Sequence, residues 1–275
     1  MGDVGRRLGA FALILGGTFG TSYALGEKLP GHSHDGSTSH SHWGEMTTPV
    51  IPTTESSGYS LVNNSISDDN ATFRLVDPDG ILVTSFAVVH GSGIHAFVTP
   101  PDLSTLEHTH PSLSADGTWQ VPLPGPGRWH VVIEATPTNA SRTVTVATDI
   151  DNSSTPPTTG VATGPATGFS TDTTTIAQVG DLTVTREGLM FVVTKPDGSI
   201  VVDFEPYLGA GAHLVVLRVD DLAYVHLHDT GEMQGMVMFN GDIPTGSVYR
   251  LFLQFATEGQ PYKVAFTVPA SEVLE

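Results

Sequence analysis

Apolar and polar residues alternate along much of the chain after residue 58, and this alternation predicts β-strands. Leu251, Leu253 and Phe255, for example, alternate with Arg250 and Gln254. Turn-forming residues recur at intervals of about 8–12 residues, and no segment after residue 45 has the apolar spacing of a helix. The chain is therefore expected to be all-β, with antiparallel strands packed as immunoglobulin-like or cupredoxin-like sandwiches.

An internal repeat sets the number of sandwiches. The segments Phe73–Phe86 and Phe191–Phe204 each read as a strand, a Pro-Asp-Gly turn and a second strand. Each copy closes with a glycine-containing turn and an alternating strand, at Pro124–Ala135 and Pro244–Phe255. The repeat predicts two tandem sandwiches.

Composition marks the segments between and before the repeats. The stretch before the first copy and the stretch between the copies are rich in Thr and Pro, which is typical of extended spacers. The expected parts are a signal segment at 1–28, a flexible His-rich and Thr/Pro-rich stalk at 29–58, a first sandwich at 59–148, a Thr/Gly/Pro linker at 149–176, and a second sandwich at 177–275.

A histidine pattern also occurs once in each copy. A lone histidine is followed, at the same spacing in both, by a His-x-His. Imidazole is the commonest protein ligand for transition metals, so each triplet is a candidate metal site. The triplets are His95, His108 and His110 in the first copy and His213, His226 and His228 in the second.

The spacing allows each triplet to converge on one sheet face. If an antiparallel hairpin turns at Asp220-Asp221, His213 lies opposite His228 and diagonal to His226. Directly opposed Cβ atoms lie about 5 Å apart and diagonal ones roughly 7 Å, within reach of a shared ion. The first copy has the same midpoint, with a less regular turn. The alternative is that both copies keep these histidines for a structural hydrogen-bond network. His130 is expected to be a solvated residue and no ligand.

The N-terminal residues indicate an extracytoplasmic protein. Arg6 and Arg7 precede an apolar run from Leu8 to Leu25, which is the pattern of a signal segment. The run is long enough to span a bilayer, and an uncleaved single-pass anchor with the arginines in the cytoplasm is favoured. Cleavage after Ala24, which would give a secreted protein, is the alternative.

Charge and cysteine content narrow the ligands. The formal net charge of −18 argues against nucleic acid as a partner, because phosphates need a basic surface. The absence of cysteine restricts a metal site to nitrogen, oxygen or thioether ligands, which suits a copper or zinc ion. A further His-rich tract after the signal segment is expected to capture metal loosely, through His32, His34, His40 and His42.

The residues around the second triplet resemble a family. Asp203–His228, together with Tyr249–Phe255, is similar to exported actinobacterial proteins that are anchored by one N-terminal helix and often described as heavy-metal-associated or copper-related. The likeness extends over most of residues 59–268. It implies an envelope location, a β-sandwich, a metal link and the two triplets as the site.

Two positions depart from the family pattern or from the repeat. The His-x-His is typically followed by Pro in this family; Pro111 fits, whereas Asp229 stands there in the second copy as an auxiliary carboxylate ligand. His90 has Leu208 as its counterpart, so it is an auxiliary ligand in the first copy alone.

Catalysis is not expected. Three histidines with an open position match the layout of a catalytic zinc site. However, strand alternation points Glu107, the nearest candidate base, away from His108, and the chain lacks a serine nucleophile elbow, a phosphate loop or an HExxH motif. The sequence favours a copper-binding protein that buffers the ion or passes it to an envelope protein partner. The alternative is a structural or interaction module with two immunoglobulin-like domains.

Overall fold

The computed structural model describes residues 47–67, 69–153, 175–233, 235–272 and 274. Every regular element in these ranges is a β-strand, and all strand pairs are antiparallel, as the alternation predicts. None of the described residues belongs to a helix long and apolar enough to cross a membrane. The expected anchor and the histidines of the N-terminal tract lie outside the described residues.

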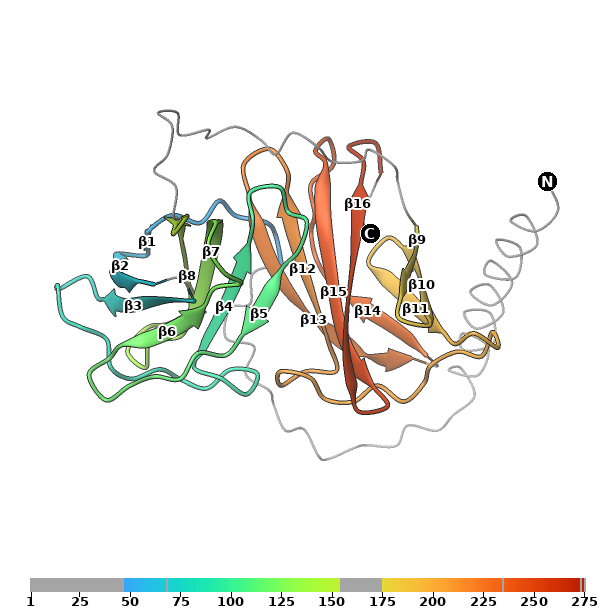
Figure 1. The fold of residues 1–275 in the computed structure, drawn as a ribbon, viewed down its shortest axis with the longest axis horizontal. Helices are drawn as coiled ribbons and strands as arrows, with labels where there is room; N and C mark the ends of the chain where they lie inside the picture. Colours follow the sequence, from blue (N-terminus) through green and yellow to red (C-terminus); the bar gives the residue numbers. More distant parts are fainter. Residues whose placement is uncertain (1–46, 68, 154–174, 234, 273, 275) are drawn as a thin grey trace, which may run out of the picture. The chain divides into compact units, whose positions relative to one another are not determined.

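The first copy forms two four-stranded sheets (Figure 1). One has the order β1-β2-β3-β6 and the other β5-β4-β7-β8. Alternate residues of both sheets, such as Phe73 of β3, Trp119 of β6 and Val131 of β7, meet in one apolar core, so the two sheets are the layers of a sandwich. The strands are β1 Glu55–Ser56, β2 Tyr59–Ile66, β3 Asn70–Val76, β4 Ile94–Thr99, β5 Glu107–Thr109, β6 Trp119–Pro122, β7 Arg128–Ala135 and β8 Val144–Asp151.

The second copy repeats this arrangement within one continuous sheet. Its order is β16-β15-β12-β13-β14-β11-β10-β9, because β13 hydrogen-bonds to both β12 and β14. The two halves of this sheet share one core that includes Phe191 of β11 and Leu214 of β12. The strands are β9 Ile176–Val179, β10 Leu182–Glu187, β11 Met190–Thr194, β12 Ala212–Arg218, β13 Tyr224–Met233, β14 Met236–Phe239, β15 Tyr249–Thr257 and β16 Gln260–Val268.

The Pro-Asp-Gly turns form where the repeat places them, but the strands expected after them do not. Gly80 donates its backbone N–H to Asp77 and Gly198 donates to Lys195, both at 2.9 Å. The residues that follow each turn make isolated bridges instead of a regular strand, such as Val76 with Leu82. The reason is that β6 and β14 already pair with β3 at Asn70–Phe73 and with β11 at Met190–Val192, which leaves only the ends of these strands for the residues after the turn.

The outer faces of the two sandwiches pack against each other. Phe97 of β4 and Val132 of β7 lie in one buried cluster with Val215 of β12 and Phe252 of β15, although their strand neighbours face the sandwich cores. At the rim of this contact, Lys263 donates to the carboxylate of Glu107 at 2.7 Å. The described residues accordingly belong to one compact unit.

The structure overturns the expectation for His130. The residue lies on the outer face of β7, as the alternation predicts, but it is 9% exposed instead of solvated. Its Nδ1 lies 2.7 Å from the Asp149 carboxylate. The error arose because an outward-facing residue was assumed to face water.

The described end of the predicted stalk is also ordered by backbone pairing. Val50 and Tyr224 exchange backbone hydrogen bonds of 3.0 and 2.7 Å, and Ala147 donates to Thr53 at 2.7 Å. Residues 47–58 are therefore attached to both sandwiches, which corrects the expectation of a flexible segment there. Pro lacks a backbone N–H, but every other residue of this segment has both an N–H and a C=O group that can pair.

Candidate metal centre

Two equivalent hairpins present the histidine triplets. In the second copy β12 pairs with β13 so that His213 lies opposite His228, in the register that the spacing predicts. In the first copy Phe97 of β4 lies opposite His108 of β5, which is the matching register. Because side chains alternate along a strand, the core receives residues such as Leu214, and the histidines point to the outer face.

The two triplets form one cluster, since the outer faces that carry them are packed together. Rings of the same copy contact one another, and His108 also contacts two rings of the second copy. Centroid distances between contacting rings of the triplets run from 4.3 to 6.0 Å. The contacts are His95–His108, His95–His110, His108–His110, His213–His226, His213–His228 and His226–His228 within the copies, and His95–His226, His108–His213 and His108–His226 between them.

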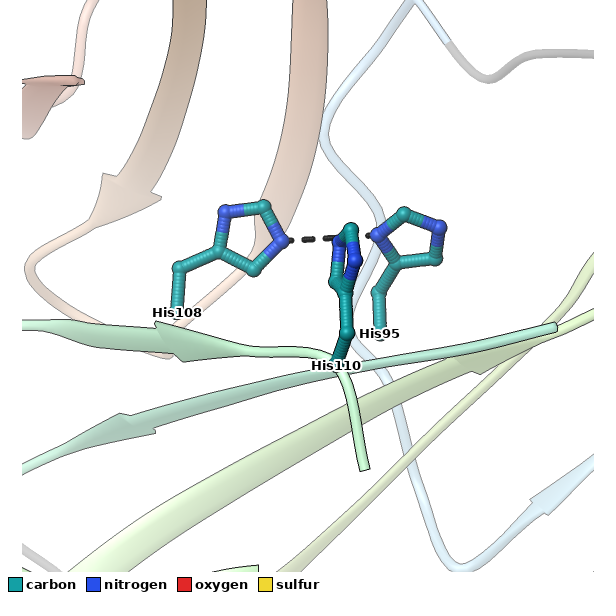
Figure 2. Close-up of side chains that lie close together, drawn as sticks. All are labelled: His95, His108 and His110. Carbon is teal, nitrogen blue, oxygen red and sulfur yellow. Dashed lines mark hydrogen bonds between the residues drawn. The ribbon is translucent and has the colours of Figure 1, made fainter. Parts of the chain in front are cut away.

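Hydrogen-bond partners orient the inner pair of the first copy. His95 Nε2 lies 3.0 Å from the carbonyl oxygen of Val89, and His108 Nδ1 lies 3.0 Å from Gln254 Oε1 of the second sandwich. The remaining nitrogens, His95 Nδ1 and His108 Nε2, are 3.4 Å apart, and Figure 2 shows them turned toward each other beside His110.

The second copy repeats this arrangement with one change. His213 Nε2 lies 2.8 Å from the carbonyl oxygen of Tyr207, and His226 Nδ1 lies 3.1 Å from the Glu134 carboxylate of the first sandwich. The inner nitrogens, His213 Nδ1 and His226 Nε2, are 3.0 Å apart. A carboxylate thus occupies the position that the amide of Gln254 occupies in the first copy.

These partners determine which nitrogen of each neutral ring carries the proton. Carbonyl, amide and carboxylate oxygens accept hydrogen bonds, so the outer nitrogen of each inner ring must be the donor. In a neutral imidazole the other nitrogen then carries a lone pair and no proton. Two such nitrogens therefore face each other in each copy, and they attract only if a cation lies between them.

Burial keeps the inner rings neutral. Desolvation lowers the pKa of His95 to about 4, of His108 to about 2 and of His213 to about 3. The same cause lowers the pKa of His226 well below its usual value and that of His110 by less. A shared proton is therefore disfavoured, whereas a metal ion binds the neutral ring.

The ligand atoms are close enough for a metal ion. Two groups of three imidazoles have ligand nitrogens within 4.8 Å of one another: His95, His108 and His110, and His108, His213 and His226. Nitrogens bound to one tetrahedral zinc at about 2.0–2.1 Å lie roughly 3.3 Å apart, close to the 3.4 Å between His95 and His108. His110 Nε2 is buried without a hydrogen-bond partner in the described structure, so it is available as the third nitrogen of the first group.

The auxiliary residues lie beside the cluster. The ring of His90 stacks on that of His228, with centroids 3.6 Å apart and planes 26° apart. Asp229 accepts a 2.9 Å hydrogen bond from the backbone N–H of Ala212. Among the described residues, neither His90, Asp229 nor His228 joins the two groups of three, and the second group takes its third imidazole from the first sandwich.

Sequence reasoning missed Glu134 and Gln254. Both lie on the strand next to a triplet, with Glu134 opposite His95 and Gln254 opposite His213. The signal was present, because the repeat aligns the two residues, and each is a polar residue on the strand beside the lone histidine of its copy. The alternation within one strand could not show that each side chain supports a histidine of the other sandwich.

Comparison with known proteins gives one family match and no match among curated proteins. The family is a domain of unknown function (DUF8832), and its model matches residues 169–272, which include the second copy and exclude the first. The second triplet and Gln254 lie within the matched range.

Similarities to solved structures are weak. A two-domain fibronectin type-III segment of chicken tenascin is 11% identical, with 76% of this chain and 97% of that chain covered, at a TM-score of 0.23. The BSP domain of a biofilm-associated protein is 15% identical, with 78% and 30% covered, at 0.21. The FN1–FN3 domains of chicken CNTN1 are 10% identical, with 79% and 66% covered, at 0.21. TM-scores of this size do not establish a shared fold.

Proposed function

We propose that this is an extracytoplasmic transition-metal-binding protein whose site is the buried histidine cluster. The observation that carries the proposal is the pair of ring nitrogens that face each other in each copy, 3.4 and 3.0 Å apart, with a hydrogen-bond acceptor on the opposite side of each ring. A bound cation would turn both repulsive contacts into ligand bonds. The buried groups would also exclude hydrated alkali ions, which imidazole binds poorly.

Copper is the ion that we propose. Imidazole suits copper, zinc, iron and nickel, and for a given set of nitrogen ligands Cu²⁺ binds most tightly among the divalent ions of the first row. The half-buried rings of His110, His90 and His228 lie at the edge of the cluster, where an ion would enter or leave. Exchange at this edge fits a protein that buffers the ion or passes it to an envelope protein partner.

The envelope location and the fold type belong to the same proposal. The N-terminal apolar run and the likeness to exported actinobacterial proteins support an anchored, extracytoplasmic chain with two immunoglobulin-like or cupredoxin-like domains. We propose no catalytic role, because Glu107, the candidate base, forms an ion pair with Lys263.

Metal titration of the full chain tests the proposal. His32, His34, His40 and His42 are replaced by serine so that the N-terminal tract does not contribute, and Cu²⁺, Cu⁺ and Zn²⁺ are titrated in turn. His108→Gln removes the imidazole that is common to both groups of three. It should weaken metal binding by more than about 100-fold, which is more than the loss of a residue that only supports a ligand would cause. His130→Gln, a buried histidine outside the cluster, is the matched control and should bind as the parent does.

A structural module is the second candidate. It is favoured by the hydrogen bonds of His95 and His213 to backbone carbonyls, which a purely structural network would also make. It predicts no binding tighter than millimolar by the parent chain. That result, with the parent and His108→Gln equally folded by circular dichroism, would contradict the metal proposal.

A further inference from the structure

Residues of each sandwich support the candidate ligands of the other. Glu134 of β7 holds His226 of the second sandwich, and Gln254 of β15 holds His108 of the first. His108 also lies with His213 and His226 in one of the two groups of three. Separation of the sandwiches would therefore remove a ligand from this group and the hydrogen-bond partner from two imidazoles.

The side chains that surround the cluster are apolar and buried, which strengthens these interactions. Phe97 stacks on His108 and contacts His226 edge-on, with centroids 4.3 and 4.8 Å apart. Tyr224 and Val215 belong to the same apolar cluster and are fully buried. Low dielectric strengthens the interaction between a cation and its ligands, so the site is strongest when the two faces are packed together.

We propose that metal binding clamps the two sandwiches together, with the ion held across their boundary by His108, His213 and His226. The inference rests on the proposed function and adds the coupling to it. Binding of the ion and packing of the two faces are linked equilibria. If packing raises the affinity for the ion by some factor, the bound ion must therefore raise the equilibrium constant for packing by the same factor.

The carboxylate of Glu134 provides the sharpest test. A carboxylate bonded to a ligand histidine orients the ring and makes it a stronger ligand, and removal of such a partner typically lowers metal affinity by about 10–100-fold. Glu134→Gln keeps an accepting oxygen and removes the charge. The substitution is compatible with the fold, because Gln254 occupies the equivalent position in the other copy and makes the equivalent hydrogen bond.

The experiment measures Cu²⁺ and Zn²⁺ affinity of the full chain with the four N-terminal-tract histidines replaced by serine. Glu134→Gln should lower the affinity by about 10–100-fold. Asp149→Asn is the matched control, because Asp149 is also a carboxylate bonded to a buried histidine, His130, outside the cluster. The metal affinity of Asp149→Asn should stay within about twofold of that of the parent, since neither Asp149 nor His130 is a ligand in the proposal.

A second measurement reports on the packing directly. The chain has no cysteine, so Ser65→Cys in the first sandwich and Gln260→Cys in the second give two unique spin-label sites, both exposed. Metal should narrow the distance distribution between the labels, and Glu134→Gln should require correspondingly more metal to do so.

The outcomes separate the two proposals. A parent that binds metal, with Glu134→Gln equal to it and the label distribution unchanged by metal, would overturn the clamp and leave metal binding standing. A parent that binds no metal would overturn both.

Discussion

Each inner imidazole of the cluster has one nitrogen bonded to an acceptor and the other aimed at a second imidazole. His95 and His213 use backbone carbonyls as acceptors, and His108 and His226 use side chains of the opposite sandwich. The nitrogen of each ring that has no acceptor is thus the atom that would bind a metal ion, and it is also the atom that would take up a proton at low pH.

The metal-free chain should lose stability as the pH falls below about 6.5. Unfolded histidine has a pKa near 6.5, whereas burial holds the pKa of His95, His213 and His108 at about 4, 3 and 2. Below 6.5 the unfolded state therefore binds more protons than the folded state, and each histidine contributes a loss of up to about 1.4 kcal/mol per pH unit until its folded pKa is reached.

Urea unfolding at pH 7.5, 6.0 and 5.0 checks this prediction. The parent should lose stability steeply between the last two values, and His108→Gln should show a shallower loss because it has one fewer buried imidazole. Equal stability of the parent at all three values would contradict the assignment of neutral, desolvated rings.

The sequence predicted the histidines but not their partners. Duplication of the triplet led us to expect a site in each copy, and the register predicted for the second triplet is confirmed, because His213 lies opposite His228. Glu134 and Gln254 were missed because they act across a boundary that periodicity within one strand does not describe.

The hairpins that carry the triplets are positioned by the loops before them. In each copy a backbone carbonyl oxygen accepts the hydrogen bond of the first histidine, and the residue after that carbonyl has a positive φ. This next residue is His90 in the first copy, with a φ of 47°, and Leu208 in the second, with a φ of 49°. The two equivalent loops touch each other: a Cβ added to Gly209 would lie 2.0 Å from the His90 carbonyl oxygen. Glycine is required there by close approach as well as by its φ of 88°.

Gly209→Ala should therefore destabilise the chain by more than backbone strain alone. Gly198→Ala is the matched control, because Gly198 has a φ of 84° and a Cβ there would meet nothing within 4 Å. Both variants incur the strain of a positive φ, about 1–2 kcal/mol, and Gly209→Ala should lose a further 1–3 kcal/mol or so from the clash. Urea unfolding measures the difference, and equal losses would show that the loops do not need this contact.

At the scale of elements, local turn chemistry was more predictable than strand pairing. The Pro-Asp-Gly turns form in both copies because Gly80 and Gly198 supply the left-handed conformation. The strands expected after them are reduced to isolated bridges, since β6 and β14, which are distant in sequence, pair with most of β3 and β11 and leave only the strand ends open.

The two sandwiches pack through faces that each copy alone would expose to water. Apolar residues on the outward faces hinted at this in the sequence: Val132, for example, lies between His130 and Glu134 on the outward face of its strand. Two separate sites were expected because the copies were treated as separate domains. The packing of these faces merges the triplets into one cluster and supplies the third imidazole to His213 and His226.

The central claim is that this cluster holds a transition-metal ion between the sandwiches, and anomalous diffraction from crystals of the copper-loaded chain tests it most directly. We expect a peak at the copper edge within about 2.0–2.1 Å of nitrogens of His108, His213 and His226, taking the imidazole bond lengths of zinc as a guide. Anomalous density confined to surface residues, with the cluster unchanged at full loading, would contradict the claim.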